Sequence, residues 1–183
     1  MPTRRRAFVT VLIASSALLA ACGHHQQSAS QDEQKFLDQN RKQKGVSVLG
    51  DGLQYKVVAS GPADGPHPAK GDEVKVDYTG SLLSGSVFDS TSATGQPAVL
   101  ELGHLIPAWQ EVLPRMRPGD DWLIYTPPSL GYGAAGHPPV IPPNSVLVFD
   151  IKLLGVLKSG ENSGVKFAGT QQPEGPSLQT NAQ

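Results

Sequence analysis

Residues 146–154 read Val-Leu-Val-Phe-Asp-Ile-Lys-Leu-Leu, and they form the longest strand that the sequence predicts. Apolar side chains occur on both faces of this strand near its centre, as in strands that are covered on both sides. We therefore expect residues 146–154 to lie in the middle of a sheet, with other strands on either side of them.

Four further segments show the alternation of apolar and polar residues that is typical of half-buried strands. These segments are residues 53–57, 74–79, 99–102 and 122–126. One short helix is predicted over residues 107–113, because Pro107 fits the first turn of a helix and Pro114 ends it. The pattern predicts an α+β fold in which a five-stranded antiparallel twisted sheet wraps on one short helix.

Composition sets limits on the class of protein. The chain has 183 residues, of which 38% are hydrophobic and 17% charged, so we expect one globular domain with extensions. The 20 glycines and 16 prolines argue against a helical bundle. A net charge of −1 excludes a strong nucleic-acid footprint, and a single cysteine excludes a disulfide framework and a multi-cysteine zinc site.

The N-terminus has the features of a targeting segment. Three arginines at residues 4–6 precede an apolar run over residues 7–21, which is shorter than the roughly 20 residues that span a bilayer. The run ends in Leu19-Ala20-Ala21-Cys22, which resembles a bacterial lipobox. The resemblance implies a lipoprotein signal peptide over residues 1–21 and a lipid on Cys22. An ordinary signal peptide, or a short uncleaved anchor with an incidental cysteine, stays open as an alternative.

The segments that flank the domain are polar. We expect a tether over residues 22–30 and a short helix over residues 31–45, with capping-box spacing at its start and Gly45 as its C-cap. Only two residues of this helix are apolar, which predicts a spacer or a lightly docked arm. Residues 157–183 have no apolar period and predict a disordered tail.

One loop is long enough to suggest a function. Residues 127–145 contain six prolines and three glycines, which is incompatible with regular structure. Loops of this length inside a compact domain are uncommon and often functional. The loop carries the phenol of Tyr132 and the apolar pair Val140 and Ile141.

Several short motifs occur along residues 52–156, and their order and spacing nearly match those of a known protein family. They are Val76-Asp77-Tyr78-Thr79-Gly80, Val87-Phe88-Asp89-Ser90, Leu105-Ile106-Pro107-Ala108-Trp109, Leu130-Gly131-Tyr132-Gly133, Gly136-His137-Pro138, Ile141-Pro142-Pro143-Asn144 and Leu147-Val148-Phe149-Asp150. Together they resemble the FKBP-type peptidyl-prolyl cis-trans isomerases. The lead-in Gly52-Leu53-Gln54-Tyr55-Lys56 is similar to the bacterial envelope branch of that family, which includes the macrophage infectivity potentiators.

The resemblance implies a binding pocket made of aromatic and apolar side chains. The residues implied as catalytic are Tyr78, Phe88, Asp89, Tyr132 and Phe149, and those implied as substrate-binding are Leu100, Ile106, Trp109, Val140 and Ile141. Ile106 would contribute its backbone N–H, and Asp89 would place a carboxylate at the rim. The chain departs from the family pattern at Leu100, where a large aromatic is common, and at Ala108 and Val112, where smaller residues are usual. No metal and no cofactor are implied.

The function implied is isomerisation of X–Pro bonds in folding envelope proteins, in a chain anchored by the lipid on Cys22. The Gly after Cys22 favours the outer membrane over the inner one, and macrolide immunosuppressants are implied as possible inhibitors. Relatives often dimerise through a long N-terminal helical domain, whereas only about 20 residues lie between the tether and the first predicted strand, so we expect a monomer. Two alternatives stay open: an FKBP-fold chaperone or binding module with little turnover, suggested by Leu100 and Val112, and a structural lipoprotein.

Overall fold

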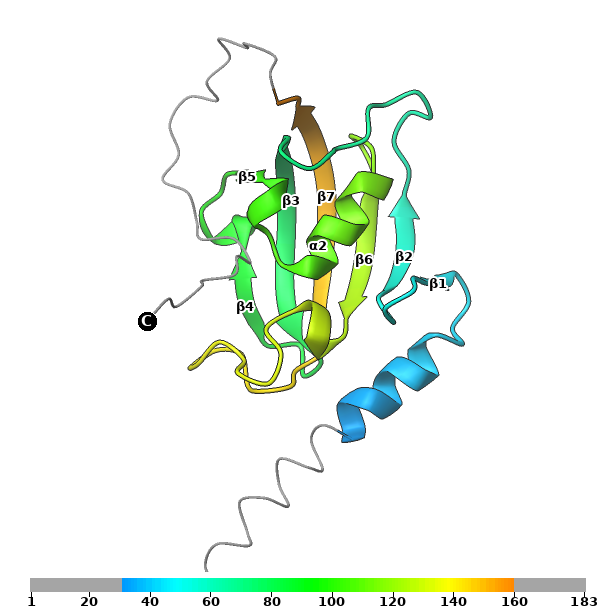
Figure 1. Cartoon of the computed structure of the whole chain (residues 1–183), viewed down its shortest axis with the longest axis vertical. Coiled ribbons are helices and arrows are strands. Elements are labelled where there is room, and N and C mark those ends of the chain that lie inside the picture. The colour runs from blue at the N-terminus through cyan, green and yellow to red at the C-terminus, as the bar shows by residue number, and fades with distance from the viewer. Residues whose placement is uncertain (1–30, 160–183) are drawn as a thin grey trace, which may run out of the picture.

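The computed structural model describes residues 31–159, which form one twisted antiparallel sheet with a short helix across one face (Figure 1). The strands are β1 (Val46–Val48), β2 (Gln54–Ala59), β3 (Glu73–Leu82), β4 (Val87–Ser90), β5 (Ala98–Glu101), β6 (Asp121–Thr126) and β7 (Leu147–Leu157), and the helix is α2 (Pro107–Val112). Single 3₁₀ turns occupy Thr91–Ala93, Leu102–His104, Leu113–Arg115 and Pro128–Leu130. The sheet order is β1-β2-β6-β7-β3-β4, and β5 pairs with β3.

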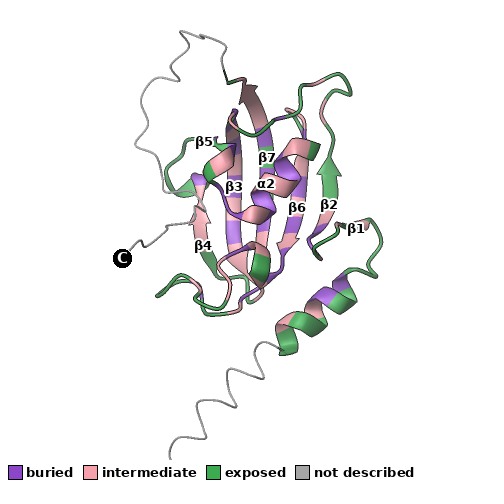
Figure 2. Ribbon diagram, in the orientation of Figure 1, coloured by how far each residue is buried: buried purple, intermediate pink, exposed green. Residues whose placement is uncertain are grey.

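The two longest strands lie side by side at the centre of the sheet. β7 pairs with β6 on one side and β3 on the other, which confirms the central place predicted for residues 146–154. Along β3, buried and partly exposed residues alternate, because successive side chains point to opposite faces of a strand. The inner face of the sheet is buried and the outer face meets solvent (Figure 2).

Helix α2 covers the inner face (Figure 1). Pro107 occupies its first turn, and Ala108, Trp109 and Val112 are its buried residues. They pack with the inward side chains of β3, β6 and β7 in one core cluster. The predicted α+β architecture, one short helix on an antiparallel sheet, is therefore confirmed.

The predicted number of strands was wrong, since the described residues contain seven strands and not five. The two that were missed are β1 and β4, with three and four residues. Segments this short carry too few residues to show a period of two. β4 is held by pairing with β3, from Thr79 to Ser81, and β1 by pairing with β2.

The N-terminal helix is shorter and better docked than the sequence predicts. It runs over residues 31–40 and is followed by turns up to Gly45, which has a positive φ of 83°. Leu37 is 3% exposed, and Asn40 donates to the buried amide oxygen of Gln54 at 3.0 Å. Of the two predicted readings, a spacer is wrong and a docked arm agrees with the structure, because Leu37 is buried and the side chain of Gln54 bonds to the helix.

The C-terminal boundary also differs from the prediction. β7 continues to Leu157, and the next two residues are bonded to the domain through Asp72. The predicted signal peptide, the lipidated Cys22 and the tether lie outside the described residues, as do residues 160–183 of the predicted tail. Within residues 31–159, no helix is both long and apolar enough to cross a membrane.

Candidate functional site

Four aromatic side chains from four different elements form a connected cluster on the inner face of the sheet. Tyr78 of β3 and Trp109 of α2 meet edge to face with ring centroids 5.1 Å apart. Trp109 meets Phe149 of β7 at 5.5 Å, and Phe149 meets Phe88 of β4 at 5.8 Å, both also nearly perpendicular. Such edge-to-face contacts are the favoured geometry of aromatic pairs.

The cluster runs from the core to the surface. Trp109 and Phe149 are 0% exposed, Tyr78 is 3% exposed, and Phe88 is only partly buried. The ring of Phe88 therefore stands at the margin where a ligand could reach the cluster. The buried Nε1 of Trp109 has no hydrogen-bond partner among the described residues.

A hydrogen-bonded pair of polar groups lies beside Phe88. The hydroxyl of Tyr78 donates to Oδ2 of Asp89 over 2.5 Å, and Asp89 follows Phe88 directly in β4. Burial, and then the neighbouring carboxylate, raise the pKa of the Tyr78 phenol far above its usual value. Tyr78 is therefore a neutral donor that holds Asp89 in place, and it is not a proton shuttle.

Tyr132 completes the polar margin from the long loop. Burial, and then the charge of Asp89, raise the pKa of its phenol to about 12. Its ring lies 5.5 Å from that of His137, centroid to centroid. At neutral pH the Tyr132 hydroxyl keeps its proton, so it is able to donate a hydrogen bond.

The remaining predicted site residues differ in how far they are exposed to solvent. Leu100, Ile106 and Ile141 are buried members of the core cluster, at 3%, 0% and 2% exposure. Val140 is 46% exposed, so the loop separates two residues that the sequence treated as a pair. The separation arises because a bridge between His137 and Ile141 turns the chain at this point.

The start of α2 fixes the backbone of Ile106. Its carbonyl accepts from the backbone N–H groups of Trp109 and Gln110, at 3.0 and 3.2 Å. The side chain of Gln110 turns back and donates to the carbonyl of Leu105 at 2.6 Å. The backbone that leads into the helix is therefore held from both sides, next to the buried Trp109.

Gly80 belongs to the site although its role was not predicted. A Cβ atom built at this position would lie 2.7 Å from the ring of Phe88 and 3.0 Å from that of Phe149. The two rings can meet only because residue 80 has no side chain. Gly80 directly follows the strand predicted over residues 74–79, and a glycine at such a position is a signal of close approach between neighbouring groups.

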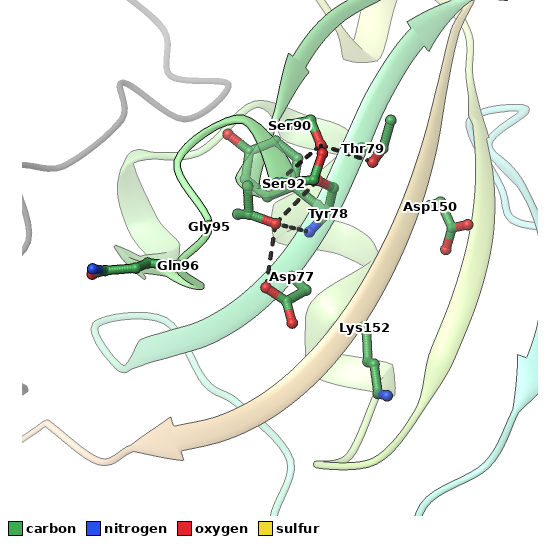
Figure 3. A pocket seen from close by; sticks show the side chains of 10 residues that line it. Asp77, Tyr78, Thr79, Ser90, Ser92, Gly95, Gln96, Asp150 and Lys152 are labelled. Atoms are coloured by element: carbon green, nitrogen blue, oxygen red, sulfur yellow. Dashed lines mark hydrogen bonds between the residues drawn. The ribbon is translucent and has the colours of Figure 1, made fainter.

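A hollow of about 510 Å³ lies on the outer face of the sheet (Figure 3). Asp77 and Thr79 alternate with Tyr78 along β3, so their side chains point away from the aromatic cluster. Hydroxyl groups in this hollow bond mainly to one another and to the backbone of Tyr78: Ser90 lies 3.0 Å from Thr79 and 2.8 Å from Ser92. This network stabilises β3 on the face opposite the aromatic cluster.

Among the described residues, no three His, Cys, Asp or Glu side chains lie close enough together to hold a metal ion. The aromatic cluster instead offers an apolar surface bordered by a carboxylate and two neutral phenols. Such a surface suits an uncharged, largely apolar segment of a ligand that also has carbonyl groups to bond.

Comparison with known proteins agrees with this description. Residues 65–154 match the family of FKBP-type peptidyl-prolyl cis-trans isomerases, and residues 10–57 match the domain amino-terminal to it. The chain is similar to the peptidyl-prolyl cis-trans isomerase Mip of Coxiella burnetii, with 49% identity over 67% of this chain and 53% of that protein. The chain spans about half the length of the curated relatives it matches.

Two crystal structures show the same fold. A peptidyl-prolyl cis-trans isomerase from Pseudomonas syringae has a TM-score of 0.67 and 32% identity, covering 72% of this chain and 96% of that one. FkpA from Escherichia coli has a TM-score of 0.68 and 37% identity, covering 75% of this chain and 64% of that one. The architecture built above from burial and strand pairing is therefore one that these proteins share.

Proposed function

Because the chain belongs to the family of FKBP-type peptidyl-prolyl cis-trans isomerases, we propose that it accelerates rotation about X–Pro bonds in proteins that are folding. The observation that carries this proposal is the chain of four edge-to-face rings that reaches the surface at Phe88, beside the bonded pair of Tyr78 and Asp89. An apolar surface with a polar border matches a prolyl ring flanked by peptide carbonyls.

The reaction requires few functional groups at the site. Rotation about an X–Pro bond interrupts amide resonance, against a barrier of about 20 kcal/mol, and neither proton transfer nor a nucleophile is needed. The planar amide has a large dipole that water stabilises, whereas the twisted amide carries less charge on its oxygen. An apolar surface therefore disfavours the planar form more than the twisted one, which is differential binding of the transition state. A thousandfold to millionfold gain requires about 4–8 kcal/mol.

Each of the predicted site residues has a role in this proposal. Phe88 contacts the prolyl ring, and the buried rings of Phe149, Trp109 and Tyr78 support Phe88 from the core. The backbone N–H of Ile106 and the protonated phenol of Tyr132 donate to substrate carbonyls, and Asp89 keeps the Tyr78 ring in position. Leu100 and Ile141 contribute apolar contacts, and Val140 meets residues beyond the proline from the exposed edge of the loop.

A protease-coupled assay with a proline peptide tests the proposal. The full chain should accelerate isomerisation, and Phe88→Ala should reduce kcat/KM at least tenfold because Phe88 is the accessible ring. Val87→Ala is the matched control, since Val87 precedes Phe88 in β4 and is 58% exposed. If the unaltered chain did not accelerate isomerisation, the proposed enzyme activity would be refuted. If the chain suppressed the aggregation of a client protein but did not accelerate isomerisation, the chaperone alternative would be supported instead.

We also propose that the protein is a lipoprotein of the cell envelope. A relative in Legionella longbeachae is named an outer membrane protein, and the lipobox-like sequence before Cys22 supplies an anchor site. In this proposal residues 1–21 are removed, acyl chains such as palmitate are added at Cys22, and residues 22–30 tether a domain over residues 52–156. The outer membrane is favoured over the inner one.

Fractionation of cells that express the chain tests this anchor. Cys22→Ser should move the protein from the membrane fraction to the periplasmic fraction, whereas Ser28→Ala, six residues away, should leave it in the membrane. Membrane retention of the Cys22→Ser protein would contradict lipidation.

The proposed partners are proline-containing envelope proteins, and macrolide immunosuppressants should compete with them for the aromatic site. We propose a monomer, which sedimentation of the protein at several concentrations tests. A stable dimer across that concentration range would refute it.

A further inference from the structure

The helix over residues 31–40 contacts the end of the long loop that carries Tyr132 and Ile141. Oε2 of Glu33 accepts a hydrogen bond from the backbone N–H of Val146 at 2.9 Å, across 113 residues of sequence. Val146 is 0% exposed and lies directly between the loop over residues 127–145 and β7. A charged acceptor therefore holds the last peptide group before the central strand.

The helix that presents Glu33 is itself fastened to the sheet at separate points. The buried amide of Gln54 donates to the carbonyl of Leu37 at 2.9 Å and accepts from Asn40 at 3.0 Å. The ring of Phe36 lies 5.7 Å from that of Tyr125, centroid to centroid. Because these contacts fix the helix independently, Glu33 is presented from a rigid support.

The loop is bonded mainly within itself. The N–H of Gly133 donates to the carbonyl of Pro128 at 2.8 Å, and the N–H of Asn144 donates to the carbonyl of Gly133 at 2.9 Å. The loop therefore behaves as one unit, and its orientation depends on the burial of Ile141 in the core and on its two ends. At those ends Thr126 pairs with Leu147 between the strands, and Glu33 holds Val146.

We propose that Glu33 is a positioning residue for the loop over residues 127–145, and that the helix over residues 31–40 serves as a strut for that loop. The bond to Val146 sets where Tyr132 and Ile141 stand relative to the aromatic cluster. The part of this inference that concerns catalysis rests on the proposed isomerase function. The part that concerns the loop does not depend on it.

Three variants of the full chain test the proposal: Glu33→Ala, Glu33→Gln and Asp32→Ala. Glu33→Ala removes the acceptor, and Glu33→Gln keeps an oxygen that can accept from Val146. Asp32→Ala is the matched control, because Asp32 is the neighbouring acid and its ion pair is with the exposed Lys35. Hydrogen exchange of backbone amides and peptide isomerisation are measured for each variant.

Glu33→Ala should speed amide exchange over residues 128–146 by about tenfold, the effect of losing a hydrogen bond to a charged group. It should also raise KM at least threefold, with a smaller change in kcat, because the loop would still reach its working position. Glu33→Gln should restore most of both properties, and Asp32→Ala should match the unaltered chain.

Unchanged exchange over residues 128–146 in Glu33→Ala would overturn the proposal, and so would exchange that rises equally in β3 and β7, since that result indicates general destabilisation. If the unaltered chain does not isomerise the peptide, the proposed function fails and the exchange measurements still decide whether Glu33 positions the loop.

Discussion

Gly80 shows how one residue controls the candidate site. β3 and β4 are paired antiparallel at this position, where Gly80 lies opposite Asp89 and the rings of Phe88 and Phe149 pack against its backbone. Any larger residue would push these rings apart, because aromatic rings cannot be compressed. The geometry of the cluster therefore depends on an absent side chain as much as on the four that are present.

Gly80→Ala should lower both stability and activity. The added Cβ atom would displace the ring of Phe88, at a cost of about 1–3 kcal/mol in the free energy of unfolding. Urea unfolding and the peptide assay measure the two effects. Gly155→Ala is the control, because a Cβ atom at this strand glycine meets only the side chain of Lys75 at 3.9 Å. Equal stability of the two variants would show that the rings at Gly80 can move freely.

Tyr132 connects the site to stability at high pH. Its phenol has a pKa of about 12 in the folded protein and a usual value of 10.0. Between these values the unfolded chain loses this proton while the folded chain keeps it, so the free energy of unfolding falls as pH rises from about 10 towards 12. Tyr132→Phe should show a shallower fall in this range, measured by urea unfolding at a series of pH values. An identical slope in both proteins would contradict the raised pKa.

At the scale of elements, the sequence predicted the parts of the fold that repeat a pattern. Five strands and α2 were recognised because each has enough residues to display its period or its proline boundaries. β1 and β4 were missed because they exist only through pairing with β2 and β3. The helix over residues 31–40 was predicted as a spacer or a lightly docked arm, but its contacts with the side chain of Gln54 were not, because no periodicity reveals them.

The site was predicted to a similar degree. The family motifs assigned Tyr78, Phe88 and Asp89 to one site, and the structure brings them together beside the buried core rings. The loop residues were harder to place, because the exposure of Val140 and the burial of Ile141 follow from a turn that only the folded chain defines. Asn144 is part of this same loop, and its positive φ was not predicted, although asparagine is a residue type that tolerates it.

Asn144 should be essential to the shape of the loop. It has a positive φ of 58°, which asparagine and glycine tolerate and β-branched residues do not. Asn144→Val should therefore cost about 1–3 kcal/mol in the free energy of unfolding and weaken peptide turnover. Asn144→Gly is the comparison variant and should remain within a few tenths of a kcal/mol of the unaltered chain, since glycine adopts this φ without strain. Equal losses in both variants would assign the effect to the amide side chain and not to the backbone.

At the scale of the whole molecule, both ends of the described chain are bonded to the domain far from their sequence neighbours. Glu33 reaches Val146 near the start of β7, and Lys158 and Ser159 reach Asp72 beyond its end. The central strand is thus restrained at both ends by carboxylates from other segments. Within the described residues, both ends of the chain are therefore held against the domain.

The restraint at the end of β7 can be tested at Asp72. Its carboxylate is 3% exposed and accepts from the N–H groups of Ser159 and Ala69 and from the ammonium of Lys158, each within 2.9 Å. Burial raises the pKa of Asp72, but these hydrogen bonds and the charge of Lys158 outweigh it, so the pKa lies below the usual 3.8.

The sign of this shift fixes the pH range of the effect. The stabilisation is present above the unfolded value of 3.8 and is lost as pH falls towards the lower folded value. Asp72→Ala should lose about 1–3 kcal/mol at neutral pH, because three donors are left without their acceptor. It should also unfold with a weaker dependence on pH below 4. Asp64→Ala, at an exposed acid, should keep the stability of the unaltered chain at neutral pH. If Asp72→Ala were as stable as Asp64→Ala, the end of β7 would not be restrained by this carboxylate.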